Sequence, residues 1–456
     1  MNRRSLFKAL GAGAAAAGLT GWPGRHGVEA VHSRVNTRSQ PSDLKITDLR
    51  VARIGRRWRR TIVRIDTNQG ISGYGEIRDG ASPTYALFLK SRILGMNPCN
   101  VDKIFRKIKQ FGGHARQAGG VVSIEMACWD LAGKAWGVPC WQMLGGKFRD
   151  RIRLYCDTTS DRDPEVMGQR LKQRMAMGFT FLKMDVGIGL LRNVPGTLTA
   201  PSGMTETSLV AHPFTGIRIT DKGLGIMRDY CATVRDIIGW EIPLAVDHFG
   251  HFPLEDCIKI AQALDPFNLA WYEDMIPWQY TDQYVMLRRS CNTPILTGED
   301  IYLKEGFLDL FRKKAIAICH PDLASSGGLL ETKKIGDLAM EHGIAMALHM
   351  AGSPVTLFSS VHCAAATENF MVMEHHSVDD DTYDTLVQGV EKPIINDGYV
   401  TVPDGPGLGI ELNEEAVKQQ LDGSGYFEPT PEWDRERSWD RTWSQLHPAA
   451  LPHFKT

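Results

Sequence analysis

The sequence has 456 residues, of which 43% are hydrophobic and 23% are charged, and its formal net charge is −1 at pH 7. These proportions are ordinary for a globular protein, and the length favours two domains over a single core. A nearly neutral chain is not expected to bind nucleic acid or an anionic membrane surface as a general partner.

The N-terminal residues predict a targeting segment and a linker. Arg3 and Arg4 precede a weakly apolar run, rich in glycine and alanine, at 9–21. We therefore expect a twin-arginine signal peptide over residues 1–30, cleaved after its last residue, and export to the periplasm; a disordered basic N-terminus is the alternative. Residues 31–42, rich in polar residues and ending near a proline, are typical of a linker. No later segment is long and apolar enough to span a bilayer.

The nine cysteines are scattered along the chain, and no two of them form a Cys-x-x-Cys pair. A protein exported by the twin-arginine route folds in the reducing cytoplasm before it leaves. We therefore expect buried, free thiols that fill the core.

Residues 43–150 predict a small α+β domain. Alternation of apolar and polar residues predicts strands at 44–54 and 61–67, and Gly70 and Gly73 mark the turn into a third strand. Strands that come first, with helices after them, favour an α+β arrangement. Helical patterns follow at residues 83–94, 101–111 and 121–136.

Short apolar runs, most of them ended by a charged residue or a histidine, begin at residue 178. From Asp247 onward they recur about every 25 residues, the length of one strand–helix unit. Each run is nearly all apolar, as is expected of a parallel strand buried on both faces. This pattern predicts a barrel over residues 151–390, followed by a C-terminal segment at 391–456. In such a barrel the strand ends meet at one mouth, which would gather Asp185, Asp247, Glu273, Glu299, Asp322, His349 and Glu374.

Three acids end successive runs and predict a metal site. The carboxylates of Asp247, Glu273 and Glu299 would point into one mouth, and crowded anions are tolerated only if they are protonated or bound to a cation. Ligation by oxygen alone, with no cysteine nearby, favours Mg²⁺. The alternative is three solvated loop acids.

The next two runs end in a carboxylate and an imidazole. Asp322 beside His349 would fix the tautomer of the imidazole and raise its basicity, which suits a general base near neutral pH. A histidine without that placement at a strand end is more often a buried core residue than a base, and this is the alternative for His349.

A signature in the first domain resembles that of a known superfamily. Residues 123–134 (SIEMACWDLAGK), 137–139 (GVP) and 144–146 (LGG) are similar to the N-terminal-domain signature of the enolase superfamily. More narrowly, they resemble the mandelate racemase/muconate lactonizing group. The resemblance covers roughly residues 44–412 and includes 402–409 (VPDGPGLG), which looks like the segment that returns to the capping domain.

This resemblance implies an α+β capping domain followed by an α/β, modified (β/α)₇β TIM-like barrel, with a divalent metal at the barrel mouth. It also implies removal of the proton next to a carboxylate, which gives a metal-bound enediolate. By position, Asp247, Glu273 and Glu299 match the family's metal ligands, and His349 with Asp322 matches its catalytic dyad. Glu374 matches an acid that hydrogen-bonds the enediolate, with a structural salt bridge as its alternative role.

The second run departs from the racemase pattern. The racemase carries Lys-x-Lys there, and its second lysine is the base on the opposite face from the histidine, whereas this chain has Lys183-Met184-Asp185. Alternation points both Lys183 and Asp185 inward. An aspartate near its reference pKa of about 3.9 is a poor base for a carbon acid. This argues against two-base racemisation, and it leaves Asp185 a binding role and Lys183 an electrostatic role toward a bound carboxylate.

Three more residues are candidates for substrate binding. His248 and His251 follow the third run, and either could protonate a leaving hydroxyl or simply pack in its loop. Arg57 lies in the arginine-rich loop at 56–60, which in this superfamily usually helps to set specificity. That loop would suit a polyhydroxylated acid, and a solvated hairpin is the equal alternative. The insertion at 188–222 should lie on the active-site side as a lid or a subunit contact.

These features predict an exported, Mg²⁺-dependent carbon–oxygen lyase that acts on a small sugar-derived acid, as an aldonate or aldarate dehydratase. His349 would remove the proton α to the carboxylate, a β-hydroxyl would leave, and the same imidazolium could protonate it. The alternatives are an epimerase, a racemase or a lactone cycloisomerase. From another class, the alternative is a non-catalytic, metal-dependent sugar-acid binding protein, against which the His349–Asp322 pair argues. We also expect a homo-oligomer.

Overall fold

The computed structural model describes residues 40–55, 59–200, 216–247, 249, 252–423 and 425–435. The proposed signal peptide and all but the end of the proposed linker lie outside these residues. Three of the predicted binding residues, Arg57, His248 and His251, also lie outside them, as does the middle of the insertion predicted at 188–222.

The capping domain is built on a three-stranded antiparallel sheet within residues 40–77, as the alternation predicts. Its strands are β1 (Ile46–Ile54), β2 (Arg60–Thr67) and β3 (Ser72–Ile77), paired in that order. Helix α5 (Gly119–Trp136), which carries most of the signature sequence, packs across this sheet and is buried over nearly its whole length. The approach is close because Gly73 and Gly75 face the helix, where a Cβ atom at either position would collide with the α5 backbone.

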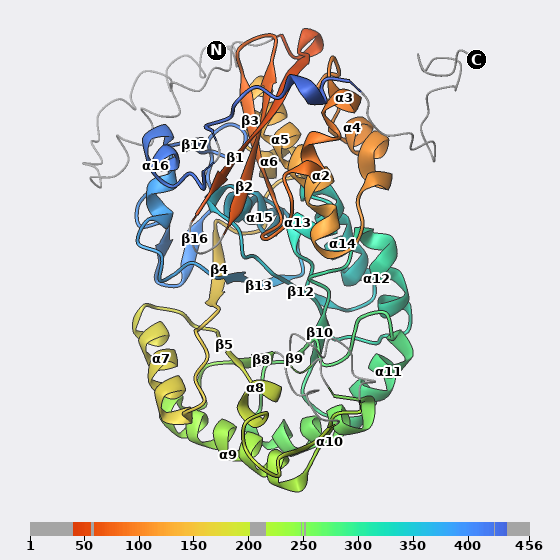
Figure 1. The fold of residues 1–456 in the computed structure, drawn as a ribbon, viewed down its shortest axis with the longest axis vertical. Coiled ribbons are helices and arrows are strands. Elements are labelled where there is room, and N and C mark those ends of the chain that lie inside the picture. Colours follow the sequence, from red (N-terminus) through yellow and green to blue (C-terminus); the bar gives the residue numbers. More distant parts are fainter. Residues whose placement is uncertain are drawn as a thin grey trace, which may run out of the picture.

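Shorter helices complete this domain (Figure 1). The predicted helix at 83–94 forms two short helices instead of one, and the second holds Lys90, whose buried ammonium pairs with Asp48 of the first strand. The remaining elements are α2 (Thr84–Leu87), α3 (Lys90–Ile93), α4 (Val101–Ile108), α6 (Cys140–Met143) and 3₁₀ turns at Pro41–Asp43, Lys109–Phe111 and Ala115–Ala118.

In the described part of the chain, eight parallel strands form a closed barrel, which confirms the predicted fold. The last strand pairs in parallel with the first, so the sheet has no open edge inside the barrel. Alternate side chains point inward and fill it with an apolar layer that includes Tyr155, Phe181 and Trp271. The strands are β4 (Arg151–Cys156), β5 (Leu182–Asp185), β8 (Leu244–Asp247), β9 (Tyr272–Glu273), β10 (Ile295–Thr297), β11 (Ile318–Cys319), β12 (Ala345–Leu348) and β13 (Phe370–His375).

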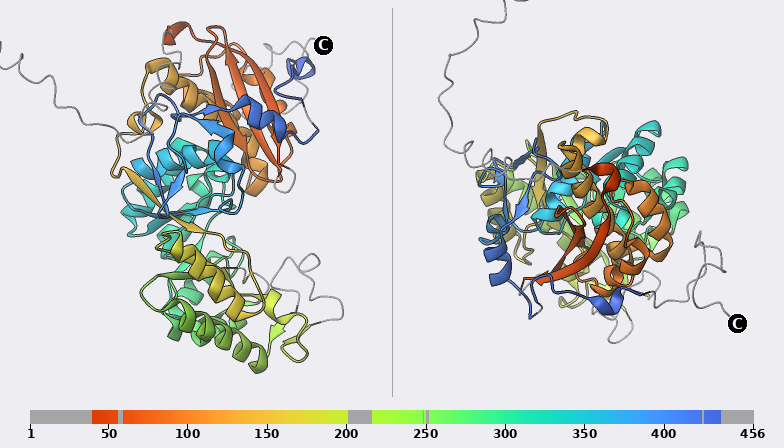
Figure 2. Two further views of the ribbon diagram at one scale, coloured as in Figure 1. Left: turned by 90° about the vertical axis from the view of Figure 1, so that its left-hand side faces the viewer. Right: turned by 90° about the horizontal axis from the view of Figure 1, so that it is seen from above.

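Helices surround the barrel strands (Figures 1 and 2). Within the insertion, the described residues form a helix and a short antiparallel pair, β6 (Leu198–Thr199) with β7 (Arg218–Ile219). No helix among the described residues is long and apolar enough to cross a membrane. The helices are α7 (Pro164–Ala176), α8 (Ile188–Leu191), α9 (Asp221–Ile238), α10 (Leu254–Leu264), α11 (Thr281–Ser290), α12 (Leu303–Arg312), α13 (Leu323–Ser326), α14 (Leu329–Glu341) and α15 (Pro354–Ala366), with a 3₁₀ turn at Asp265–Phe267.

The C-terminal segment runs from the barrel back to the capping sheet (Figure 1, blue). The amide of Gly55 donates to Gln420 O, and the amide of Asp422 donates to Arg53 O, so the segment lies along the end of β1. Its elements are a 3₁₀ turn at Tyr383–Leu386, β14 (Val387–Gln388), β15 (Ile395–Asn396), β16 (Tyr399–Thr401), β17 (Glu411–Leu412), α16 (Glu414–Gln419) and a 3₁₀ turn at Pro431–Trp433. Strand β16 pairs antiparallel with β4.

Two buried glutamates of the capping domain hold the two domains together. Glu76, on β3, accepts hydrogen bonds from Ser353 N at 2.9 Å and from Thr356 Oγ1 at 2.7 Å, at the N-terminus of α15. Glu125, on α5, accepts from Leu329 N at 2.8 Å, at the N-terminus of α14. A carboxylate at a helix N-terminus satisfies amides that lack partners within the helix. The capping sheet is thereby held against barrel helices that lead away from the site.

All nine cysteines lie in the described residues, and all are free. Cys99 and Cys291 are half-buried and the others are buried. This confirms the expectation of core thiols.

Candidate active site

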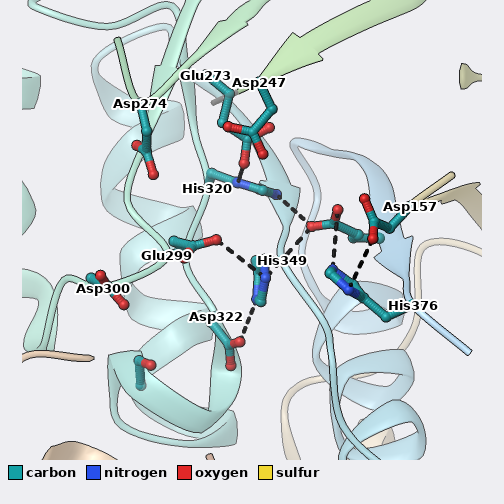
Figure 3. Close-up of polar contacts among 12 residues, drawn as sticks. Asp157, Asp247, Glu273, Asp274, Glu299, Asp300, His320, Asp322, His349 and His376 are labelled. Carbon is teal, nitrogen blue, oxygen red and sulfur yellow. Dashed lines mark hydrogen bonds and ion pairs between the residues drawn. The ribbon is translucent and has the colours of Figure 1, made fainter. Parts of the chain in front are cut away.

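The strand ends bring the predicted residues into one cluster at the barrel mouth (Figure 3). Lys183, Glu273, Asp322 and His349 are each at least nine-tenths buried, and Glu374 has no exposed surface. Buried charges need partners of opposite sign, and the contacts of this cluster supply them.

His349 and Asp322 form the predicted pair. Nδ1 of His349 lies 2.5 Å from Asp322 Oδ2 and, because a carboxylate only accepts, Nδ1 donates. Oδ1 of Asp322 accepts from Ala324 N at 2.6 Å, so the carboxylate also caps α13 and cannot turn freely. Nε2 of His349, the other ring nitrogen, lies 3.2 Å from Glu299 Oε2. Burial alone would lower the pKa of His349, but Glu299 and Asp322 raise it to about 10.

Arg78, a residue of the capping domain, also contacts this pair. Arg78 was not predicted from the sequence. Its buried guanidinium donates from Nη1 to Glu299 O at 2.8 Å, lies 3.3 Å from Glu299 Oε1 through Nη2, and lies 3.4 Å from Asp322 Oδ2. Burial would lower the pKa of Arg78, but Asp322 and Glu299 raise it, so the group stays charged. The one signal in the sequence is that Arg78 directly follows the third predicted strand.

Lys183 lies among three carboxylates on the opposite side of the cluster. Its Nζ is 3.0 Å from Asp247 Oδ2, 2.5 Å from Glu374 Oε1 and 3.9 Å from Glu273 Oε2. Burial would lower the pKa of Lys183, but these three acids raise it well above its usual range. Lys183 is therefore a buried cation held by three carboxylates. Asp185 ends the same strand beside Asp247 and is half-buried.

The predicted metal ligands divide between two groups of cations. Asp247 and Glu273 lie with Lys183, and Glu299 lies near Arg78. Glu299 also faces His349 (Figure 3). Among the described residues, the sets whose ligand atoms all lie within 4.8 Å of one another are His349, Glu374 and His376, and Glu273, His320 and Glu374. The set Asp247, Glu273 and Glu299 is not among them. In this arrangement each of the three predicted metal-ligand carboxylates lies beside a positively charged side chain or a histidine.

The donor set nevertheless fits a divalent cation. Asp274, which follows Glu273 and adopts a left-handed φ of 44°, lies close to the same acids. Burial and the charges of Glu299, Glu273 and Asp247 raise the pKa of Asp274 well above its usual range. Four acids, Asp247, Glu273, Asp274 and Glu299, therefore interact at the mouth. A hard cation with oxygen ligands would stabilise them together. A cavity of about 240 Å³ opens beside Asp274 and Glu299.

Two further histidines belong to the cluster and were not predicted. Nδ1 of His320 lies 2.9 Å from Glu273 Oε1, and its Nε2 lies 3.1 Å from the hydroxyl of Tyr155. Nε2 of His376 lies 3.3 Å from Glu374 Oε1. Both could have been found, because His320 stands two residues before Asp322 in the run 317–322 and His376 stands two residues beyond Glu374, just past the end of β13.

Comparison with known proteins agrees with this geometry. Residues 28–145 match the family described as mandelate racemase / muconate lactonizing enzyme, N-terminal domain, and residues 166–416 match the family described as enolase C-terminal domain-like. A crystal structure of a mandelate racemase/muconate lactonizing enzyme-like protein from Rubrobacter xylanophilus superimposes with a TM-score of 0.73 and 30% identity, covering 85% of this chain and 100% of that one.

Two curated relatives are dehydratases. The D-xylonate dehydratase of Haloferax volcanii is 29% identical over 395 residues, which are 85% of this chain and 91% of the relative. The D-galactonate dehydratase of Pectobacterium atrosepticum is 26% identical over 386 residues, which are 82% of this chain and 94% of the relative. The chain is an enzyme, a carbon–oxygen lyase. Because the chain matches both domain families in sequence order and carries the expected residues at the barrel mouth, it belongs to the mandelate racemase/muconate lactonizing enzyme group of the enolase superfamily.

Proposed function

We propose that this enzyme dehydrates a sugar-derived acid: it removes the proton α to the carboxylate and expels the β-hydroxyl. The observation that carries the proposal is the His349 imidazole, held at Nδ1 by Asp322 and facing the barrel mouth with Nε2. An imidazole held in this way is oriented for proton abstraction.

Mg²⁺ is the proposed cofactor, held by Asp247, Glu273 and Glu299. When bound, it would lower the charge on the substrate carboxylate and so make the α-proton more acidic. The interaction of Asp274 with Asp247, Glu273 and Glu299 supports this proposal, because four acids in one place offer oxygen ligands to a hard cation. The alternative from another class is a sugar-acid binding protein without catalysis. Binding alone does not use a buried imidazole–carboxylate pair, so the pair favours an enzyme.

Lys183 is proposed to add positive charge on the other side of the substrate. Its ammonium is held on that side by Asp247, Glu374 and Glu273. Its partner on the strand, Asp185, is a carboxylate where the racemase has its second lysine. One base therefore serves the reaction, which favours elimination over racemisation.

The substrate class is proposed to be the aldonic acids. The relatives named above act, by their names, on D-xylonate and D-galactonate, and both compounds carry hydroxyls at the α- and β-carbons. Aldaric acids carry the same α- and β-hydroxyls, so they belong in the same screen.

The testing experiment is a screen of aldonic and aldaric acids with purified protein and Mg²⁺, followed by NMR. Dehydration yields a 2-keto-3-deoxy acid, which in D₂O carries deuterium at C3, and reversible removal of the α-proton exchanges deuterium into the α-carbon of the remaining substrate. An isomer formed without loss of water would show an epimerase or cycloisomerase instead. No product and no exchange with any acid would contradict the proposal.

The protein is further proposed to be exported by the twin-arginine pathway and to act in the periplasm as a homo-oligomer. The paired arginines at positions 3 and 4 and the weakly apolar run after them support the first part. Size-exclusion chromatography with light scattering tests the oligomer.

A further inference from the structure

A second imidazole–carboxylate pair lies across Glu374 from the first. Nδ1 of His376 is 3.4 Å from Asp157 Oδ2 (Figure 3). The pair is produced by closure of the barrel: β13 joins β4 with Glu374 opposite Tyr155, and Asp157 N donates to His375 O at 3.0 Å. His376 and Asp157 therefore extend the two strands side by side beyond the last paired residues.

The ring of His376 faces the same space as the ring of His349. The two ring centroids are 5.4 Å apart, and a ligand nitrogen of each ring lies within 4.8 Å of the other. Glu374 lies between them, with Oε2 at 3.8 Å from Nε2 of His349 and Oε1 at 3.3 Å from Nε2 of His376. The His376 side chain is 26% exposed, against 6% for His349, so it lies nearer the opening.

Dehydration needs a proton donor as well as a base, because hydroxide is a poor leaving group. Resting on the function proposed above, we propose that His376 is the catalytic acid that protonates the departing β-hydroxyl, with Asp157 as its positioning residue. The base His349 takes the α-proton, and the C–H electron pair forms the new C=C bond. The C–O pair leaves with oxygen, which takes the proton from Nε2 of His376 and departs as water.

The spacing of the two rings selects the stereochemistry. Groups that attack opposite faces of a substrate, each about 3 Å from its reacting atom, would stand about 6 Å apart or more. The two imidazoles are closer than that, so acid and base act on one face and the elimination is syn. After turnover His349 holds a proton and His376 lacks one, and Glu374, with one oxygen toward each ring, offers the return route.

The test separates loss of the acid from loss of the base. In His376→Asn, dehydration should fall by about 100-fold or more, whereas α-proton exchange in D₂O should persist, because the base remains. An analogue that carries fluorine in place of the leaving hydroxyl should eliminate fluoride at nearly the parental rate in this variant, since fluoride needs no proton. His349→Asn should lose exchange and both eliminations.

Two further variants complete the design. Asp157→Asn should lower kcat for the hydroxy acid, shift its pH profile and spare the fluoro analogue, because it disturbs only how His376 is held. His342→Asn, at the C-terminus of α14 and away from the mouth, is the matched control and should behave as the parent does. Circular dichroism of each variant checks that it folds.

Three results would overturn the inference. Parental dehydration by His376→Asn would show that the residue donates no needed proton. Loss of both exchange and turnover in His376→Asn would show that His376 has a structural role or is a second base. Recovery of epimerised substrate from the parent enzyme would point to the second base. A parent that neither dehydrates nor exchanges any acid would instead overturn the proposed function itself.

Discussion

Asp322 and His349 face each other across neighbouring strands, joined by a parallel bridge just beyond β11 and β12. The bridge brings Asp322 Oδ2 to 2.5 Å from His349 Nδ1, although 27 positions separate the residues in sequence. The register of the barrel therefore orients the base. The other ring nitrogen of His349, Nε2, faces the mouth, where Glu299 Oε2 lies 3.2 Å away.

Replacing His349 should remove the chemistry, and replacing Asp322 should only weaken it. His349→Asn deletes the base, so turnover and α-proton exchange should both fall by about 100-fold or more. Asp322→Asn keeps the imidazole but loses orientation and basicity, so partial activity should remain. Exchange of the α-proton followed by NMR in D₂O measures both. Equal losses in the two variants would contradict the assigned roles.

Removing the metal should abolish activity. EDTA should stop turnover and Mg²⁺ should restore it, because among the described residues no single cation contacts Asp247, Glu273 and Glu299 together. Glu273→Gln should weaken Mg²⁺ binding in calorimetry, independent of any assay of turnover. Glu305→Gln, on the exposed side of α12, is the matched control and should bind Mg²⁺ as the parent does. Full activity of a metal-free preparation would exclude the cofactor.

Lys183 and Asp185 should differ in their effect on exchange. Lys183→Met removes a buried cation that lies 2.5 Å from Glu374 and 3.0 Å from Asp247, so KM should rise and kcat should fall, with exchange still measurable. Asp185→Asn should cost less than His349→Asn, since a carboxylate there is a weak base. If Lys183→Met abolished exchange while His349→Asn retained it, the lysine would be the base.

Acid should destabilise the fold through His362. This buried residue of α15 accepts from Trp141 N at 3.3 Å, and burial lowers its pKa from 6.5 to about 4. Between these values the unfolded chain binds a proton that the folded chain does not, so stability falls as pH drops. At pH 5.5 the loss should be about 1 kcal/mol relative to pH 7.5. Urea unfolding at both pH values should show a smaller pH dependence in His362→Gln, and an unchanged slope would contradict the assignment.

Export should depend on the paired arginines. Changing Arg3 and Arg4 together to lysine should leave an uncleaved precursor in the cytoplasm, because the twin-arginine receptor reads that pair. Fractionation and mass spectrometry of the N-terminus measure this. A variant that is still exported and cut near Ala30 would contradict the twin-arginine assignment.

The sequence by itself determined the barrel and most of the mouth. Apolar runs about 25 residues apart specify buried parallel strands, and the residue that ends each run must then lie at the C-terminal end of the barrel. Period and position are local properties, so His349, Asp322, Glu273 and Lys183 could be placed without coordinates.

Only the tertiary structure decided which of these groups touch. Arg78 reaches Asp322 because the capping domain docks on the barrel through Glu76 and Glu125, and nothing local to residue 78 encodes that docking. His376 meets Asp157 only because the last strand closes on the first. Such contacts depend on the relative placement of distant segments, which follows from packing of the whole chain and leaves no periodic trace in the sequence.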